Sequence, residues 1–181
     1  MKALEIYPNT KEIKNSDIQM KANTVYTFFS SILIDEITTL NKHIIYTDAN
    51  ALSEKKIPYF LGEQLLIGDA LILGREDFND TDVSIEQDEF SSLINYEVST
   101  FYKDVLELLS STDINLYRTF EVKKNSETIT LNTEWVLYTF NIADDRTKEY
   151  FISELRTNID SNANIEKFIQ KMAQLAMNAA G

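Results

Sequence analysis

The sequence predicts an α+β fold, with a mixed sheet and helices in the N-terminal half, followed by a long helix, a β-hairpin unit and two C-terminal helices. Three observations predict it. Several short runs before residue 75 alternate apolar and polar residues, as strands do. Apolar residues recur every three or four positions over 84–110 and near the C-terminus, as in helices. Hydrophobic residues make up 44% of the chain, which is enough to form a core.

A strand and a helix are predicted to open the chain. Lys2 to Tyr7 alternates apolar and polar residues and is followed by Pro8, which favours a strand that ends in a turn. Ser16 is a suitable helix cap, and the apolar residues after it have helical spacing. We therefore expect a helix over 17–31 that packs on one face of the sheet.

Further strands are predicted before residue 75. The β-branched run at 32–39 and the run at 43–47 are expected to pair as a hairpin. Pro58 holds the start of 57–61 extended. The apolar run 68–74 is bracketed by glycines and is predicted to be a buried strand.

Residues 84–110 are predicted to be helical. Ser84 and Gln87 have the spacing of a capping box, and the apolar residues that follow lie on one helical face. The pattern fits one long helix or two helices with a break near Asn95.

The remaining elements are predicted from the same two periods. Residues 115–123 and 128–140 are expected to be strands, and residues 144–156 and 164–178 are expected to be helices. Residues 1–110 should form an α+β domain. Residues 111–181 are expected to form either a second small unit or a part of the same domain.

Composition argues against most catalytic chemistry. The chain has no cysteine, which excludes disulfides, thiolate metal sites and cysteine nucleophiles. The single histidine, His43, lies in a strand-like run and is expected to have a structural role. Four scattered glycines do not form a phosphate-binding loop. We therefore expect no cofactor, no metal and no catalytic residues.

The location of the protein is predicted from hydropathy. No apolar run approaches the roughly 18 residues that a membrane-spanning helix needs. The first residues lack the apolar core of a signal peptide. We therefore expect the protein in the cytoplasm.

Negative charge is concentrated in one segment of the chain. The formal net charge is −12, and residues 76–89, called the acidic segment below, contain no lysine or arginine. Its seven carboxylates are Glu76, Asp77, Asp80, Asp82, Glu86, Asp88 and Glu89. This charge disfavours direct binding to nucleic acids and to anionic membranes, because both require clustered basic residues.

Three interpretations of the acidic segment remain open. It can be a solvated stretch that only confers solubility. It can dock on a basic partner, with its carboxylates imitating nucleic-acid phosphates. It can also be a calcium loop that begins at Asp80, although Ile85 and Ser91 stand where such a loop needs glycine and glutamate. For the docking interpretation, we expect that neutralising four of the acids leaves the fold intact, because the segment contains no base that could form a salt bridge.

The first half resembles a known domain family. The shared features, in order, are Met1-Lys2-Ala3-Leu4, Pro8, Ile45 to Leu52, Ile57-Pro58-Tyr59, Gly68 to Gly74 and Arg75-Glu76-Asp77-Phe78. Residues 1–94 are similar in these features to a domain family of unknown function, DUF thirty-eight forty-six, that phages and conjugative elements carry. The resemblance implies a mobile genetic element, and hence the cytoplasm of a host cell. It supplies no catalytic residues.

Aromatic residues and the C-terminus raise the question of self-association. Trp135 and Tyr138 have apolar neighbours, so they are predicted to pack in a core or at a subunit interface. The predicted helix 164–178 carries Met172 and Met177 and can pack internally or on a second copy. A homodimer is therefore one expectation.

Two functional classes follow from the sequence. The first is a non-enzymatic binding protein of a mobile element that inhibits or modulates a host macromolecule, such as a nucleic-acid-handling defence enzyme. The second is a hydrolase that uses a carboxylate pair, either Glu63 with Asp69 or Glu76 with Asp77.

Overall fold

The structure, a computed structural model, describes residues 1–19, 21, 23–39, 43–77, 79–110, 120–123, 128–132, 137–141 and 145–158. The chain divides into two compact units. Unit 1 consists of Met1–Gly62 and Leu66–Glu97, and unit 2 consists of Glu63–Leu65 and Val98–Gly181.

Unit 1 contains a six-stranded sheet. Five of its strands have the order β2-β1-β7-β4-β3, and the sixth, β8, pairs with residues 74–76 at the end of β7. Its strands are β1 (Lys2–Tyr7), β2 (Glu12–Asp17), β3 (Ile34–Thr39), β4 (His43–Asp48), β7 (Ala70–Glu76) and β8 (Asn79–Thr81). All of these pairs are antiparallel. The central strand β7 places Ile72 opposite Leu4 of β1 and Ile45 of β4.

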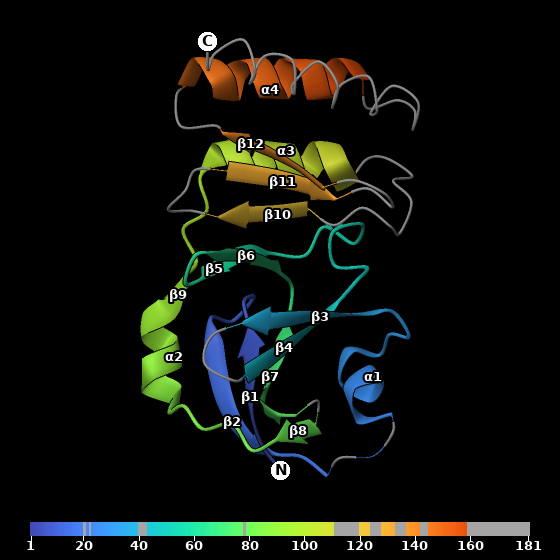
Figure 1. The fold of residues 1–181 in the computed structure, drawn as a ribbon, viewed down its shortest axis with the longest axis vertical. Helices are drawn as coiled ribbons and strands as arrows, with labels where there is room; N and C mark the ends of the chain where they lie inside the picture. Colours follow the sequence, from blue (N-terminus) through green and yellow to red (C-terminus); the bar gives the residue numbers. More distant parts are fainter. Residues whose placement is uncertain are drawn as a thin grey trace. The chain divides into compact units, whose positions relative to one another are not determined.

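Both faces of this sheet are covered within unit 1. Helix α1 (Thr24–Phe29) packs over the face that carries Ile44 and Leu71, and α2 (Gln87–Leu93) packs over the other (Figure 1). Burial on both sides explains why β4 and β7 are nearly continuous apolar runs instead of alternating ones.

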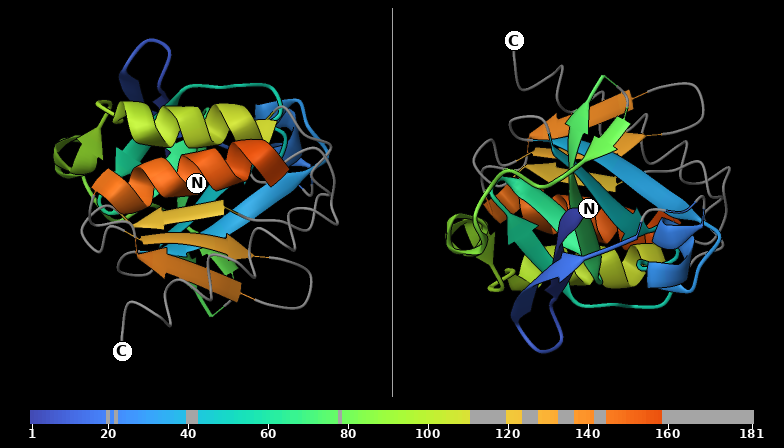
Figure 2. Two further views of the ribbon diagram at one scale, coloured as in Figure 1. Left: turned by 90° about the horizontal axis from the view of Figure 1, so that it is seen from above. Right: turned by 90° about the horizontal axis from the view of Figure 1, so that it is seen from below.

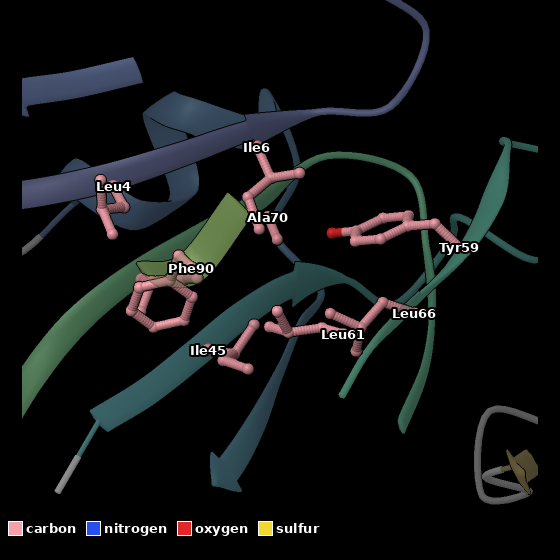
Figure 3. Close-up of a cluster of buried hydrophobic side chains, with 9 residues drawn as sticks. Leu4, Ile6, Ile45, Tyr59, Leu61, Leu66, Ala70 and Phe90 are labelled. Atoms are coloured by element: carbon pink, nitrogen blue, oxygen red, sulfur yellow. The ribbon is translucent and has the colours of Figure 1, made fainter. Parts of the chain in front are cut away.

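The larger core cluster lies on the α2 face. Its buried side chains come from β1, β4, β7, α2 and the neighbouring strands β5 (Pro58–Leu61) and β6 (Gln64–Ile67). They are Leu4, Ile6, Ile45, Tyr59, Leu61, Leu66, Ala70, Ile72 and Phe90 (Figure 3). Each large apolar side chain buried in this way contributes about 1.5–3 kcal/mol. The short strand β9 (Ile94–Asn95) pairs with β5.

The described part of unit 2 contains two helices and an antiparallel strand meander. Helices α3 (Thr100–Ser110) and α4 (Asp145–Asn158) lie side by side (Figure 2), with ring centroids of Phe101 and Phe151 6.3 Å apart. The strands β10 (Phe120–Lys123), β11 (Thr128–Asn132) and β12 (Leu137–Asn141) pair in sequence order.

The class is α+β, but the predicted layout is wrong. The sheet of unit 1 is antiparallel and not mixed, and strands β1 to β8 all lie before residue 82. Four helices are present among the described residues. Of the two alternatives for residues 84–110, the single long helix is wrong and the pair of helices with a break near Asn95 is correct, because Ile94 and Asn95 pair with β5 as β9.

Two details of the first 40 residues also differ from the prediction. The predicted helix over 17–31 is the six-residue α1, because the stretch before it forms β2. Asn15 lies opposite Leu4 and Ser16 opposite Ala3, so both residues belong to the sheet and cap no helix. The predicted hairpin of 32–39 with 43–47 matches the β3–β4 pair.

Candidate binding surface

The acidic segment runs from the end of β7 through β8 into α2. The β7–β8 hairpin places Glu76 opposite Asn79 and Arg75 opposite Asp80. Asp77 lies in the turn with a φ of 47°, a left-handed conformation that Asp tolerates better than most residues. The segment is therefore part of the folded sheet and not a free loop.

A pair of hydrogen bonds ties the segment to β1. The backbone N–H of Lys2 donates to Oδ1 of Asp82 over 2.9 Å. The backbone N–H of Val83 donates to the carbonyl of Lys2 over 3.0 Å. Asp82 thus has a structural role, although its side chain is exposed.

His43 ties the segment to β4. Its side chain is buried, and its Nε2 accepts the backbone N–H of Ser84 at 3.3 Å, with the Ser84 hydroxyl 3.1 Å away. The ring also packs edge-to-face on Phe90 of α2, with centroids 5.9 Å apart. His43 thus holds both Ser84, which lies three residues before α2, and Phe90 of α2 on the sheet.

Of the seven predicted site residues, Asp80 accepts the most hydrogen bonds from other side chains in the described structure. The hydroxyl of Tyr46 donates to its Oδ2 at 2.9 Å, and Arg75 Nη2 donates to its Oδ1 at 3.0 Å. Arg75 also contacts Glu36 of β3 at 3.4 Å. Burial and the hydrogen bond to Asp80 raise the pKa of Tyr46. These bonds use both carboxylate oxygens of Asp80, so it is poorly available as a calcium ligand.

The expectation that this segment has no salt bridge to lose is therefore wrong. Its interior contains no base, but Arg75 directly precedes it and becomes the cross-strand partner of Asp80 in the hairpin. Neutralising Asp80 would leave the Arg75 guanidinium without that partner.

The start of α2 also differs from the prediction. The helix begins at Gln87, with Glu86 as an extended N-cap that makes no side-chain capping bond. Ser84, the predicted cap, faces His43 instead. Gln87 fixes the helix on β2, because it accepts a bond from Asn15 at 2.8 Å and donates to the carbonyl of Ile13 at 2.9 Å.

The other five predicted site residues are exposed to solvent. They are Glu76, Asp77, Glu86, Asp88 and Glu89. The ion pairs found among the described residues involve none of them. Asp88 and Glu89 lie in the first turn of α2, where the helix dipole favours negative charge.

The carboxylate pairs proposed for a hydrolase are Glu63 with Asp69 and Glu76 with Asp77. Glu63 belongs to unit 2 and Asp69 to unit 1, and Glu76 and Asp77 are both exposed. Burial raises the pKa of Asp69, and the nearby Lys56 opposes this effect. Across the described residues, no group of three or more His, Asp and Glu side chains is placed to hold a metal ion.

Other predictions fall wholly or partly outside the described residues. Trp135 and the predicted helix 164–178 with Met172 and Met177 lie outside them, and Tyr138 is described only as part of the β12 backbone. None of the helices in the described part of the chain is long and apolar enough to cross a membrane.

Comparison with known proteins gives no relative. No family model matches the chain, and no curated protein or solved structure matches it either. The geometry of the site therefore has to carry the functional argument.

Proposed function

We propose that this protein binds a basic surface of another macromolecule through its acidic segment and does not act as an enzyme. One observation carries the proposal. Five exposed carboxylates with no ion pair among the described residues are held on a segment that hydrogen bonds fix to β1, β2 and β4.

The fixed backbone matters for binding energetics. A flexible acidic tail must be ordered when it binds, and this ordering weakens the complex. A segment already fixed at Lys2, Ile13 and His43 avoids most of that cost. Its field steers positively charged surfaces towards it and repels nucleic acids.

The nature of the partner follows from charge and from the family resemblance. A groove that binds nucleic-acid phosphates is a basic surface of the kind that such carboxylates would complement. The resemblance of residues 1–94 to a family carried by mobile elements favours a host protein as the target. We therefore propose inhibition of a nucleic-acid-handling host enzyme, with the chain acting in the host cytoplasm.

Two matched variants test the proposal, and each removes four negative charges. The segment variant spares Asp80 and Asp82 and carries Glu76→Gln, Asp77→Asn, Asp88→Asn and Glu89→Gln. The control variant neutralises exposed acids outside the segment with Asp17→Asn, Glu97→Gln, Glu107→Gln and Glu149→Gln.

The measurement is displacement of a fluorescent DNA duplex from a basic, sequence-independent DNA-binding protein, followed by fluorescence anisotropy. The parent protein and the control variant should displace the duplex, and the segment variant should do so much less effectively. If the two variants displace the duplex equally well, net charge alone is responsible and the proposed site is wrong.

A further inference from the structure

A second interaction surface is formed by the outer edge of β3. In the described part of the sheet, β3 is the last strand and pairs only with β4. An edge strand presents unpaired backbone donors and acceptors, which can pair with a strand from another chain.

The register shows which backbone groups point outward. The N–H of Ala49 donates to the carbonyl of Leu33 at 3.0 Å, so Leu33 and Ala49 form a hydrogen-bonded pair. Hydrogen-bonded and non-bonded pairs alternate in an antiparallel ladder. Residues 35 and 37 therefore bond to β4, and the N–H and C=O groups of residues 34, 36 and 38 face away from it.

The side chains along this edge are acidic. Asp35 and Glu36 are both exposed, and they project to opposite faces of the sheet because neighbouring strand residues alternate. Asp35 makes no ion pair within the described residues. Desolvation and the like charge of the nearby Asp48 raise the pKa of Asp35, and a cation placed there would offset the repulsion between the two carboxylates.

An apolar anchor precedes the strand. Ile32 is 85% exposed, the highest value among the large hydrophobic residues that are exposed in the described structure. Tyr26 of α1 is also exposed, and its carbonyl accepts the backbone N–H of Ser31. Ile32 lies in the short connection that leads into β3, and Tyr26 lies in the helix before that connection.

We propose that the outer edge of β3 binds an extended basic segment of another protein, which adds to the sheet as a further strand. Its backbone would pair with residues 34, 36 and 38. Its lysine or arginine side chains would neutralise Asp35 and contact Glu36, and an apolar residue would cover Ile32. The inference is independent of the proposed function, because it uses a different surface.

A second copy of this chain fits the edge less well. Two β3 strands paired with each other would place two carboxylates on each face of the sheet, without a base from either strand. Like charges in paired strands are destabilising. The charge of the edge thus favours a basic partner over a homodimer through β3.

A pair of substitutions at Glu36 isolates the contribution of the backbone. Glu36→Pro and Glu36→Val both remove the carboxylate, but only proline removes the outward N–H. Proline is tolerated on an edge strand where its missing N–H faces away from the neighbouring strand. Both are introduced into the segment variant, so that the acidic segment does not contribute to binding.

The probe is a ten-residue peptide of alternating lysine and threonine with blocked ends, and its dissociation constant is measured by isothermal titration calorimetry. The Pro variant should bind about fivefold more weakly than the Val variant, the effect of one lost hydrogen bond. A peptide N-methylated at every amide should lose most of its affinity. Equal affinity in both comparisons would overturn the proposal, because charge alone would then explain binding.

A second measurement covers the case in which the Pro variant does not fold. In the segment variant with Glu36 intact, the peptide should shift the amide NMR signals of residues 34, 36 and 38 and slow their hydrogen exchange. Shifts confined to other residues would overturn the proposal. If the shifts lie elsewhere but the segment variant displaces the DNA duplex less effectively than the control variant, the proposed function stands and only the β3 site is wrong. Concentration-dependent dimerisation through β3 would also contradict it.

Discussion

The hydroxyl of Tyr46 donates a 2.9 Å hydrogen bond to Oδ2 of Asp80, and this bond joins β4 to β8 across 34 positions of sequence. Arg75 contacts both residues, with Nη2 3.0 Å from the Asp80 carboxylate and 3.1 Å from the Tyr46 hydroxyl. The acidic segment is thus anchored by one of its own carboxylates. Carboxylates therefore have two roles in the acidic segment. Asp80 holds the segment in place, and the exposed acids near it are available to bind a partner.

Removing the Asp80 charge should destabilise the protein. We expect Asp80→Asn to lower the free energy of unfolding by about 1–2 kcal/mol, because the Arg75 guanidinium loses a partly buried charged partner. Urea denaturation checks this value. Asp77→Asn is the matched control and should have little effect, since Asp77 is exposed and Asn accepts its left-handed backbone. Equal losses in the two variants would contradict the anchoring role.

Gly74 of β7 has no side chain, and this allows Thr81 and Asp82 to lie close to its backbone. A Cβ atom at this position would lie 2.2 Å from the carbonyl oxygen of Asp82 and 2.5 Å from the Thr81 hydroxyl. Gly74→Ala should therefore cost about 3 kcal/mol of stability, in the upper range for overpacking. Thermal and urea unfolding test this, with Asn79→Ala at an exposed position of β8 as the control. A stable Gly74→Ala protein would show that the segment does not pack as described.

The raised pKa of Asp69 has a consequence for the pH dependence of stability. Burial makes the folded state bind this proton more tightly than the unfolded state, so stability falls as pH rises towards the folded pKa. Asp69→Asn removes the charge and should raise the melting temperature at pH 7 by ~1–3 °C. The gain should vanish below the unfolded pKa of ~3.9. A gain of the same size at pH 3 and pH 7 would contradict this explanation.

The parts of the fold that were predicted correctly have strong local patterns. The run at 43–47 is apolar at almost every position and corresponds to β4, and the predicted helix over 144–156 corresponds to α4. The pairing of β3 with β4 was also predicted, because the sequence has Asn41 and Lys42 between two strand-like runs.

The misplaced elements depend on pairing with other strands rather than on their own pattern of apolar residues. Strand β2 contains a single apolar residue, Ile13, and is a strand because β1 pairs with it. The helical spacing over 84–110 continues through Ile94, but its pairing with Leu61 of β5 breaks the helix there. The β1–β2 pairing leaves no alternating pattern in β2, whereas a break near Asn95 was one of the two alternatives that the helical pattern allowed.

The acidic segment was recognised from the sequence, but the different surroundings of its carboxylates were not. The run of acids marks residues 76–89 as a charged stretch, and six of its seven carboxylates are exposed. Nothing local distinguishes Asp80 from Asp82 or Asp77, because the distinction comes from Tyr46, Lys2 and the hairpin register. Arg75, opposite Asp80 across a two-residue turn, was the one available signal.

The segment variant should remain folded. Its four substitutions avoid Asp80 and Asp82, and none removes an ion pair found among the described residues. Loss of the two acids in the first turn of α2 should cost about 0.3–1 kcal/mol each, and relief of repulsion between neighbouring acids should offset part of it. Circular dichroism and thermal melting check this prediction. Loss of the cooperative transition would show that these acids have a structural role.

The most direct test of the central claim compares the dissociation constants of the segment and control variants for a fluorescent twenty-residue oligolysine. The proposed docking surface predicts that at 0.05 M salt, where charges interact over about 10 Å or more, the segment variant binds roughly tenfold more weakly than the control variant. The two values should converge at about 0.5 M salt, because exposed charges are then screened within a few ångströms. Equal dissociation constants at low salt would show that binding depends only on net charge, and would contradict a docking role for residues 76–89.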